Sequence, residues 1–471
     1  MTSKLNFDLG LAMLERLEVM IESPYLRLLA PSLPMHGWAT RPAAADPSVL
    51  LVVGVATVIC GSDRRADAEL RCHWPRLRAA FLAAGYPAPA EPVLSSHFRY
   101  YRDSVLGGAM PDAFRVECRE MAVGQVLAMD QMPAVDSPWL QPLAEQTVVA
   151  DGTWMKAASE VRSRRDSRAA KGGTPRILDD VSRRNKEKAW GYNMCIRSTR
   201  GSAARQRIIL DVVREVGGKE LDVVVPAVLR LREQLGDRFR CLVYDGAMRG
   251  VHNRELRAAG LVTMNKPRGI RERDQWERFR GMRLGQSQAV FELPTGCVDR
   301  HLLNVSAGMM WELSRTPVGG FQRLRALEVV GLERHRNVDG TYRWEMRLTI
   351  RCRHGDHTVV IDPNVKKIPA VSVKTLMAKP SAKTRGKAKV NLSDDLRLAQ
   401  VNEDYFWNVY GRRNDAEGTN KNLKSDYGLG HRARSYTAER LEFDMWLLVM
   451  LTNTLAWKEH IQEGRHLRTA A

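Results

Sequence analysis

The sequence contains few cysteines, and those present follow neither a disulfide pattern nor a zinc-finger pattern. Its 471 residues include 7 cysteines, an odd number without any C-x-x-C pair. Such wide, unpaired spacing argues against a disulfide framework and against a zinc ribbon. The run Cys352-x-His354-x2-His357 has the residue types of a metal site, but it lacks a fourth ligand at a useful spacing. The sequence therefore favours no zinc site.

Long apolar segments are also absent. The longest stretch without a charged residue covers 47–62, which is shorter than the roughly 20 apolar residues of a membrane-spanning helix. Asp8, Glu15 and Glu18 interrupt the apolar N-terminal residues, and no basic lead precedes an apolar core as in a signal peptide. We therefore expect a cytoplasmic protein without a membrane span.

Acidic residues are outnumbered by basic ones. The 73 Lys plus Arg residues exceed the 54 Asp plus Glu residues, which gives a formal net charge of +19. An excess of this size indicates a polyanionic partner, and nucleic acid is the commonest, although charge alone supports only non-specific binding. Hydrophobic residues make up 44% of the chain and charged residues 27%, which excludes a disordered chain and fits about three folded domains.

The first part of the chain is predicted to be mainly helical. Apolar side chains recur at helical spacing over 11–21 and again over 70–81. The apolar run 50–60 between them is typical of a strand or a buried segment. The proline-rich segment 133–142 marks the best domain boundary.

Strands alternate with helices after this boundary. The expected strands are 147–154, 190–196, 208–213, 240–245 and 261–265, and the expected helices are 224–236 and 253–259. This alternation predicts a mixed or parallel sheet covered by helices. A β-rich segment follows, with strands expected at 289–293, 302–306, 324–332, 342–351 and 357–362 and a hairpin turn at Val338-Asp339-Gly340. Helices are expected again at 395–427, with one break, and at 437–460.

The strongest local signal is a spaced set of four polar residues near the C-terminal end. Tyr410, Arg413, Glu417 and Lys424 follow the spacing Y-x2-R-x3-E-x6-K. On one α-helix these side chains would fall within a stripe about 60° wide, so that one face would present a phenol, two cations and a carboxylate. The competing interpretation is a solvated helix face with i, i+4 charge pairs.

The same helical geometry distinguishes among the acids of this region. Asp415 would point to nearly the opposite side from Glu417, which nominates Glu417 as the functional acid. Glu403 would lie two turns earlier on the same face and is the alternative.

Two aspartates end predicted strands and each precedes a glycine, Asp151 in ADGT and Asp245 in YDGA. A strand-end aspartate of this kind is most often a turn former. Together with Glu417, however, the two aspartates form a three-carboxylate set of the type that hard divalent cations bind through oxygen. Two such ions about 3.5–4 Å apart can activate water and stabilise the leaving oxygen in phosphodiester cleavage.

With these residues the chain resembles the DDE transposases of bacterial insertion sequences, in the branch defined by a Tyr-Arg-Glu-Lys signature (the "IS four" group). The resemblance covers roughly 145–460. It implies an α/β fold in which a ribonuclease H-like catalytic core is interrupted by a β-rich insertion and preceded by a mainly helical N-terminal domain. The implied domains are 1–140 for binding DNA ends, 145–284 with 392–462 for the core, and 285–391 for the insertion with its basic loop.

The resemblance also implies a role for each of the six residues. The catalytic and metal-binding residues would be Asp151, Asp245 and Glu417, holding two Mg²⁺ ions for which Mn²⁺ could substitute. The residues that hold phosphates of the transposon end would be Tyr410, Arg413 and Lys424. Arginine can grip a phosphate through two hydrogen bonds, while lysine acts as a point charge.

The implied activity is cut-and-paste DNA transposition, with metal-dependent cleavage at transposon ends followed by strand transfer into target DNA. The partners would be double-stranded DNA, as inverted-repeat ends and as target, and a second copy of the chain in the DNA synapse. The location would be the bacterial nucleoid. Two alternatives stay open: a ribonuclease H-like nuclease that cleaves without joining, and a DNA-binding protein that has lost catalysis.

Several further segments have two interpretations each. Trp311 and Trp344 are candidates to support a flipped base, but a tryptophan in a β-rich unit is more often core. The basic run 162–188 could clamp DNA or be a solvated excursion, and the basic run 372–390 could be a DNA-facing loop or a linker. The segment 97–102 interleaves aromatic and basic residues, as either a nucleic-acid surface or a packed helix would.

Overall fold

The architecture was obtained as a computed structural model. It describes residues 9–35, 45–156, 180–181, 190–201, 206–215, 220–365, 368–377, 388–427 and 437–469. The protein is a mixed α/β protein whose chain forms two compact units, each assembled from separated segments. Unit 1 comprises Met1–Met132, Asp151–Ala227 and Asp415–Ala471, and unit 2 comprises Pro133–Ala150 and Val228–Asn414.

Helices dominate the first segment of unit 1, as the sequence predicts. They are α1 (Leu9–Ile21), α2 (Pro24–Leu29), α3 (Pro47–Cys60), α4 (Asp63–Ala83), α5 (Ser95–Tyr100) and α6 (Asp112–Ala128). The apolar stripes of α1 and α4 face a common core that contains Leu14, Leu17, Leu70 and Trp74.

The apolar run 50–60 is a helix, so its prediction as strand-like is wrong, whereas its prediction as buried is confirmed. Asp46 caps α3 by accepting a hydrogen bond from the Ser48 backbone N–H at 2.8 Å, and Pro47 occupies the first turn. Gly61 ends the helix with a left-handed φ of 80°. Because α3 is apolar on every side, it is buried as a central helix. Within the described residues, no helix is long and apolar enough to cross a membrane.

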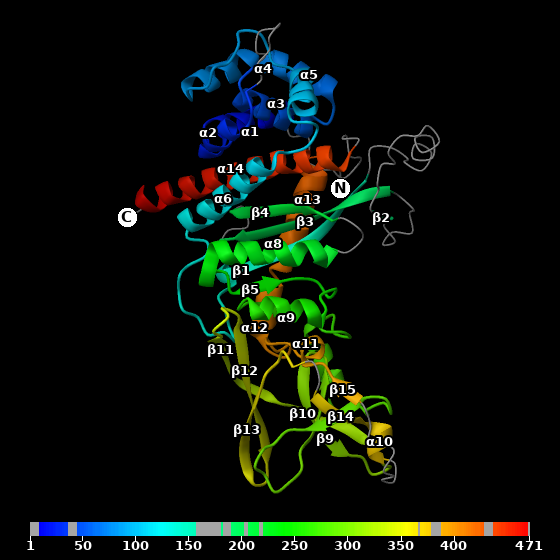
Figure 1. Ribbon diagram of the computed structural model, residues 1–471. Helices are drawn as coiled ribbons and strands as arrows, with labels where there is room; N and C mark the ends of the chain where they lie inside the picture. The colour runs from blue at the N-terminus through cyan, green and yellow to red at the C-terminus, as the bar shows by residue number, and fades with distance from the viewer. Residues whose placement is uncertain are drawn as a thin grey trace, which may run out of the picture. The chain divides into compact units, whose positions relative to one another are not determined.

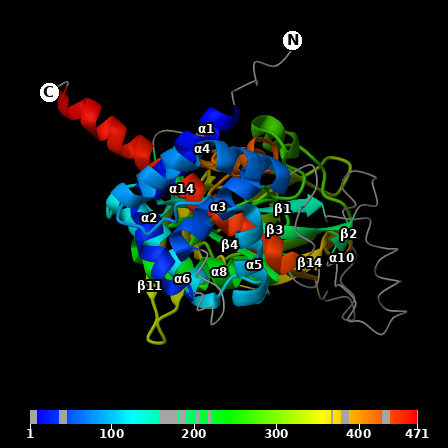
Figure 2. The ribbon, with the colours of Figure 1, turned by 90° about the horizontal axis from the view of Figure 1, so that it is seen from above.

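The long helix α14 (Ala438–Thr469) runs through the centre of unit 1. The N-terminal helices contact it on one side and β4 (Arg207–Arg214) on the other, and α3 crosses over it in Figure 2. Asn453 of α14 is fully buried and bonds the edge of β4 twice, with its amide accepting from Ile209 N and donating to Ile209 O, both at 2.9 Å. The helix α14 therefore covers the apolar face of β4 and also forms hydrogen bonds with backbone groups of that strand.

The main sheet runs in the order β2–β3–β1–β5–β6, with β4 paired to β3 (Figure 1). Its remaining strands are β1 (Thr147–Lys156), β2 (Asp180–Val181), β3 (Trp190–Arg200), β5 (Cys241–Val243) and β6 (Val262–Met264), with α8 (Glu220–Leu235) and α9 (Gly250–Ala258) along the chain. The pairs β1–β5 and β5–β6 are parallel, and β3–β4 is antiparallel. All five strands and both helices expected for this stretch are observed, with shifted ends.

The later part of unit 2 is β-rich, as expected. One sheet has the order β10–β9–β8–β7–β14–β15 and a second has the order β11–β12–β13. Their strands are β7 (Ala289–Glu292), β8 (Leu302–Ser306), β9 (Met309–Arg315), β10 (Phe321–Ala326), β11 (Glu328–Arg336), β12 (Tyr342–Cys352), β13 (Gly355–Ile361), β14 (Ile368–Ser372) and β15 (Ala388–Val390). The expected hairpin turn at 338–340 joins β11 to β12, and the expected strand 324–332 is divided between β10 and β11.

Short helices replace the nearly continuous helix expected over 395–427. They are α12 (Asp404–Tyr410) and α13 (Arg413–Lys421), and α13 continues into a π-helical turn η6 (Asn422–Asp426); α10 (Val373–Met377) and α11 (Leu392–Asp395) come before them in the chain. A turn at Gly411 and Arg412 separates α12 from α13. The segment that carries the four-residue signature is therefore interrupted twice.

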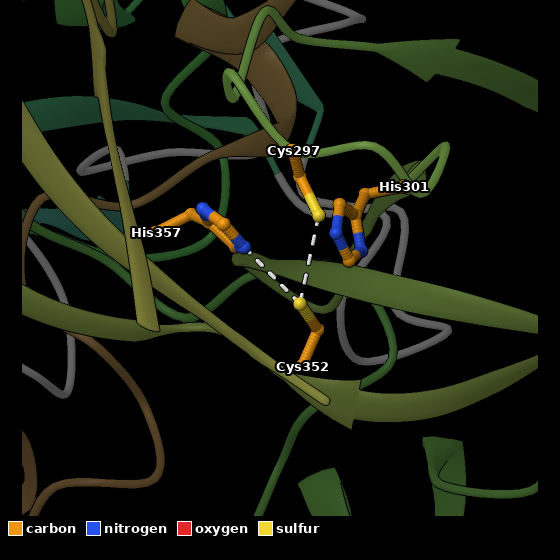
Figure 3. Close-up of side chains that lie close together, drawn as sticks. All are labelled: Cys297, His301, Cys352 and His357. Atoms are coloured by element: carbon orange, nitrogen blue, oxygen red, sulfur yellow. Dashed lines mark hydrogen bonds between the residues drawn. The ribbon is translucent and has the colours of Figure 1, made fainter. Parts of the chain in front are cut away.

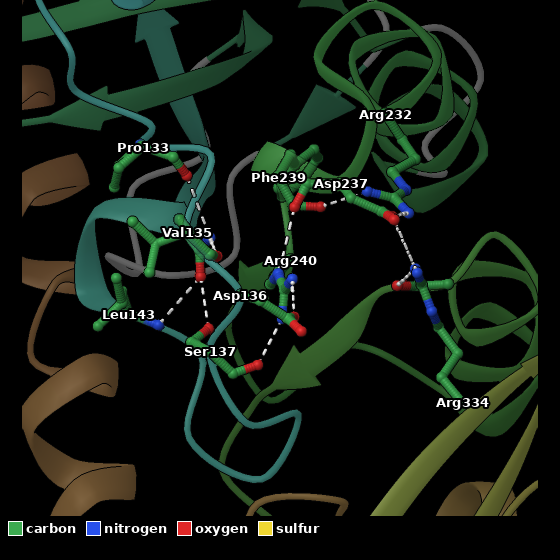
Figure 4. A network of polar contacts seen from close by, with 12 residues as sticks. Pro133, Val135, Asp136, Ser137, Leu143, Arg232, Asp237, Phe239, Arg240 and Arg334 are labelled. Carbon is green, nitrogen blue, oxygen red and sulfur yellow. Dashed lines mark hydrogen bonds and ion pairs between the residues drawn. The ribbon is translucent and has the colours of Figure 1, made fainter.

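A polar network in unit 2 links the proline-rich segment to the residues that directly precede β1 and β5 (Figure 4). The Arg240 guanidinium donates to the Ser137 carbonyl at 2.5 Å and to the Asp136 carboxylate at 2.6 Å. Gln146, fully buried, donates to the Val135 carbonyl at 2.8 Å and accepts from the Ser137 hydroxyl at 2.7 Å. The proline-rich segment is thus tied to the starts of β1 and β5 by hydrogen bonds to its own carbonyls.

Candidate active site

Asp151 lies within β1 in the part of the strand that belongs to unit 1, and its carboxylate faces α13 and η6. The Asn420 amide donates to Asp151 Oδ2 at 3.0 Å. Burial lowers the pKa of Lys424, in η6, while the Asp151 carboxylate acts in the opposite direction and favours the charged ammonium. Asp151 and Lys424, both predicted from the sequence, are therefore brought together, with Asn420 as an additional partner.

A second carboxylate, that of Glu220, packs against the glycine that follows Asp151 in β1. A Cβ atom on Gly152 would lie 2.4 Å from Glu220 Oε2, so that the Glu220 side chain occupies the space that any other residue would need. Asn193 on β3 donates to Glu220 Oε2 at 2.9 Å and to Glu215 Oε2 at 2.5 Å. Burial raises the pKa of Cys195 on the same strand, and the charges of Glu220, Glu215 and Asp151 raise it further.

Glu215 and Glu220 were not nominated by the sequence. They stand at the end of β4 and the start of α8, far in the chain from every motif. The one available signal was Gly152, because a glycine inside a strand often marks a close approach of another group.

Glu417 and Asp415 lie on opposite sides of α13, as predicted. Asp415 is buried and forms ion pairs with Arg200 Nε at 2.9 Å and with Arg207 Nη2 at 3.2 Å. Glu417 is exposed. Asp415 thus joins α13 to β3 and β4, whereas Glu417 is the acid of this helix that solvent can reach.

The four signature residues do not share one regular helix, which corrects the calculated 60° stripe. Tyr410 ends α12, Arg413 begins α13, Glu417 lies within α13, and Lys424 lies in the π-helical turn. Gly411 and the wider π turn change the angles between them. Tyr410 and Arg413 belong to unit 2, and Glu417 and Lys424 to unit 1.

Tyr410 is held rigidly within unit 2. Its ring is 8% exposed and stacks on Phe406, with a centroid distance of 5.6 Å and an interplanar angle of 5°. The Lys266 ammonium lies 5.0 Å from the Tyr410 ring centroid and 5.3 Å from that of Trp407. Cation–π attraction of this kind holds a positive charge beside the first signature residue.

Asp245 in unit 2 follows β5 and forms the turn that its glycine neighbour suggests. Its Oδ1 accepts from the Ala247 backbone N–H at 2.8 Å. The register of the parallel β1–β5 pair joins Val149 to Val243. Asp151 follows Val149 by two residues within β1, and Asp245 follows Val243 by two residues, beyond the end of β5.

Other predicted nucleic-acid contacts are placed in the core or lie outside the described residues. Trp311 and Trp344 are both fully buried, and their indole N–H groups donate to the carbonyls of Ser306 and Arg257. In the segment 97–102, the buried residues are Phe98, Tyr101 and Arg102, which favours the packed-helix interpretation. The basic run 162–188, apart from the two residues of β2, and the centre of the run 372–390 lie outside the described residues.

We also compared the sequence with known protein families and curated proteins. No protein-family model matches the chain, and no curated protein matches it.

Proposed function

We propose that the protein is a DNA transposase that cleaves transposon ends and joins them to target DNA by metal-dependent phosphoryl transfer. The observation that supports the proposal is the parallel pairing of β1 and β5 through Val149 and Val243, because Asp151 and Asp245 each follow this pair by two residues in the sequence. Side chains at equivalent positions of such strands point to one face and lie about 5 Å apart. We propose that the chain keeps this direction for the two residues after Val243, so that both aspartates reach the same face of the sheet.

The order of elements supports the same proposal. In the resembling family the first aspartate lies on the first strand of a ribonuclease H-like core, the second on the fourth strand, and the glutamate on a helix after a β-rich insertion. Apart from the two-residue β2, β1 is the first strand of the main sheet and β5 the fourth. The two β-rich sheets follow, and Glu417 comes afterwards on α13.

The donor atoms suit hard divalent cations. Asp151, Asp245 and Glu417 offer carboxylate oxygens, the ligands that Mg²⁺ and Mn²⁺ prefer. Neither aspartate is fully buried and Glu417 is exposed, so hydrated ions and DNA could reach them. Two Mg²⁺ ions bound there would activate water and then the 3′-OH of the cleaved strand. We assign these three residues as catalytic and metal-binding.

The chain's own side chains would orient the acids and the DNA. Asn420 holds one oxygen of Asp151 in place. Lys424 would supply a positive charge to a phosphate next to Asp151, and Arg413 could grip another phosphate through two donors. The stacked ring of Tyr410 fixes the direction of its hydroxyl, which would donate to a phosphate oxygen.

The partners follow from the reaction. Double-stranded DNA, as inverted-repeat ends and as target, would be attracted by the net charge of +19. Synapsis of two ends calls for two catalytic centres, so we propose a homodimer when DNA is bound.

The test uses linear DNA that contains the gene and several hundred flanking base pairs, incubated with the protein and Mg²⁺, with every nick and joined product mapped. Asp151→Asn, Asp245→Asn and Glu417→Gln should each reduce cleavage and joining by roughly a hundredfold or more, because each removes a metal ligand worth several kcal/mol in the transition state. Glu403→Gln is the matched control, since Glu403 is the exposed N-cap residue of α12 and the alternative acid.

Each outcome decides between the functions. Paired cuts at inverted repeats that join to target and vanish in the three variants support the transposase. Cleavage without joining would favour a nuclease, and DNA binding without cleavage would favour a DNA-binding protein that has lost catalysis. Activity lost in Glu403→Gln but kept in Glu417→Gln would overturn the assignment of the glutamate.

A further inference from the structure

Two cysteines and two histidines converge in the β-rich part of unit 2 (Figure 3). Cys297 lies in the loop between β7 and β8, His301 directly precedes β8, Cys352 ends β12, and His357 lies on β13. One ligand atom from each of the four residues lies within 4.8 Å of all the others. In Figure 3 both thiols and both imidazole rings point into a common space.

The distances within this cluster are within about 0.4 Å of those expected for a tetrahedral metal site. Cys297 Sγ lies 3.6 Å from Cys352 Sγ, and Cys352 Sγ lies 3.1 Å from His357 Nε2. Zinc bonds of about 2.3 Å to sulfur and 2.0–2.1 Å to nitrogen give tetrahedral edges of about 3.8 Å between two sulfurs and about 3.5 Å between sulfur and nitrogen. The sulfurs are also well beyond the roughly 2.05 Å of a disulfide bond.

His301 is oriented as a metal ligand by a carboxylate behind it. Its Nδ1 lies 2.8 Å from Glu312 Oε1, and Glu312 is held in turn by Arg325 Nε at 2.7 Å. The ring is 7% exposed, and Nε2 is buried without a hydrogen bond. A proton on Nδ1 would direct the lone pair of Nε2 toward the cluster, which is the usual carboxylate–histidine–zinc arrangement.

Each of the two cysteine sulfurs accepts a backbone hydrogen bond. The Asp299 N–H donates to Cys297 Sγ at 3.4 Å, and the His354 N–H donates to Cys352 Sγ at 3.3 Å. In both cases the donor is the second residue after the cysteine. Each sulfur is therefore held in position by a backbone N–H group of the loop or turn that follows it.

We propose that Cys297, His301, Cys352 and His357 bind a structural Zn²⁺ ion. Thiolate and imidazole ligands in a tetrahedral set select zinc, and four protein ligands leave no position for substrate. The ion would join the start of β8 in the six-stranded sheet to the β12–β13 hairpin of the three-stranded sheet. This inference is independent of the proposed transposase activity.

A second cluster of potential ligands carries no comparable argument. Glu333, His335 and Glu345 come together on β11 and β12. Both carboxylates already form ion pairs, Glu333 with Arg347 at 2.7 Å and Glu345 with Arg343 at 3.0 Å. Exposed charge pairing on a strand surface accounts for this group.

The test measures the metal content of the purified full chain after exposure to ZnCl₂ and removal of unbound ion. Wild type should retain zinc equimolar with the chain, and Cys352→Ser and His357→Asn should each lose it. Glu312→Gln should keep the four ligands but weaken zinc affinity about 10–100-fold, because it removes the carboxylate that orients the His301 ring. The controls are Cys72→Ser, an exposed cysteine on α4, and His354→Asn, an exposed histidine in the β12–β13 turn.

Two further measurements keep the proposal falsifiable if a variant folds poorly. Cobalt bound to the wild-type chain should show the visible bands of a tetrahedral ion and a thiolate-to-metal charge-transfer band. A zinc chelator should lower the melting temperature of wild type. A wild-type chain that binds neither ion, or a Cys297–Cys352 disulfide found under non-reducing conditions, would overturn the site.

Discussion

The absence of a side chain at Gly152 allows the Glu220 carboxylate to pack directly against β1. The Glu220 carboxylate lies where a Cβ on this residue would be, and Asn193 fixes Glu220 from the neighbouring strand. Gly152 therefore leaves room for the Glu220 carboxylate against β1, next to Asp151 in the chain.

We expect Gly152→Ala to reduce metal-dependent DNA cleavage by about tenfold or more. The added methyl group would displace the Glu220 carboxylate and break its hydrogen bond to Asn193. The measurement is the Mg²⁺ dependence of cleavage, which should shift to higher concentration, together with the melting temperature.

Gly124→Ala is the matched control for this change. Gly124 lies on an exposed face of α6, and a Cβ there would contact nothing within 4 Å. Replacing a glycine inside a helix by alanine should stabilise the protein by roughly 0.5–1 kcal/mol and leave cleavage unchanged. Equal effects of the two substitutions on cleavage would contradict a special role for Gly152.

At the scale of elements, the sequence predicted which helices and strands exist better than it predicted where each of them begins and ends. The alternation of strands and helices over 147–265 is observed because periodicity reports burial directly. The apolar run of α3 has no such periodicity, since the helix is buried on all sides, and only Asp46, Pro47 and Gly61 identify its ends. The capping residues, rather than hydrophobicity, would have distinguished a helix from a strand there, and the prediction did not use them.

The candidate site was predictable only where its residues lie close in the chain. The spacing of Glu417 and Asp415 within one helix correctly separated their two sides. The proposed zinc ligands Cys297 and Cys352 are 55 residues apart, and only the packing of two sheets brings them together. The pairs C-x3-H and C-x4-H were visible in the sequence, but neither is complete alone.

Asp237 joins a helix end to a strand within unit 2 (Figure 4). It lies after α8 and forms ion pairs with Arg334 of β11, at 2.9 Å, and with Arg232 of α8. Hydrogen bonds from Arg334, together with Arg232, hold the pKa of Asp237 well below its usual value. The folded state therefore favours the ionised carboxylate more than the unfolded chain does.

We expect this pair of contacts to weaken in acid. A depressed folded-state pKa stabilises the protein above the unfolded-state value of about 3.9, and that contribution disappears as pH falls further toward the folded-state value. The difference in urea unfolding midpoint between wild type and Asp237→Asn should be present at pH 7 and shrink between about pH 4 and 2. The side chain is 54% exposed, so solvent screening keeps the difference small.

A difference in urea midpoint that stays constant over this range would contradict the role of Asp237. Asp136→Asn is the comparison, because Asp136 also pairs with an arginine, Arg240, but is almost fully exposed. Its substitution should change the midpoint little at any pH.

At the scale of the whole molecule, the basic excess predicts how DNA affinity responds to salt. Each phosphate neutralised by lysine or arginine releases counterions, so affinity falls steeply with ionic strength. We expect binding to an arbitrary labelled duplex, measured by fluorescence anisotropy, to weaken roughly a thousandfold between about 50 and 200 mM salt. Lys424→Ala should reduce the logarithmic salt slope by about one. Affinity that is indifferent to salt would contradict DNA as the partner.

The central position of α14 has a consequence for biosynthesis. Every described segment of unit 2 leaves the ribosome before Ala438, whereas the core of unit 1 lacks its middle helix until residues 438–469 are made. Contacts such as Ile209 with Asn453 close a loop of 244 residues, and long loops of this kind form slowly. In the meantime the apolar surface of α3 is exposed on the nascent chain, where chaperones would bind. A second copy of the chain emerging nearby could donate its own α14, and domain-swapped dimers are the expected misfolding product.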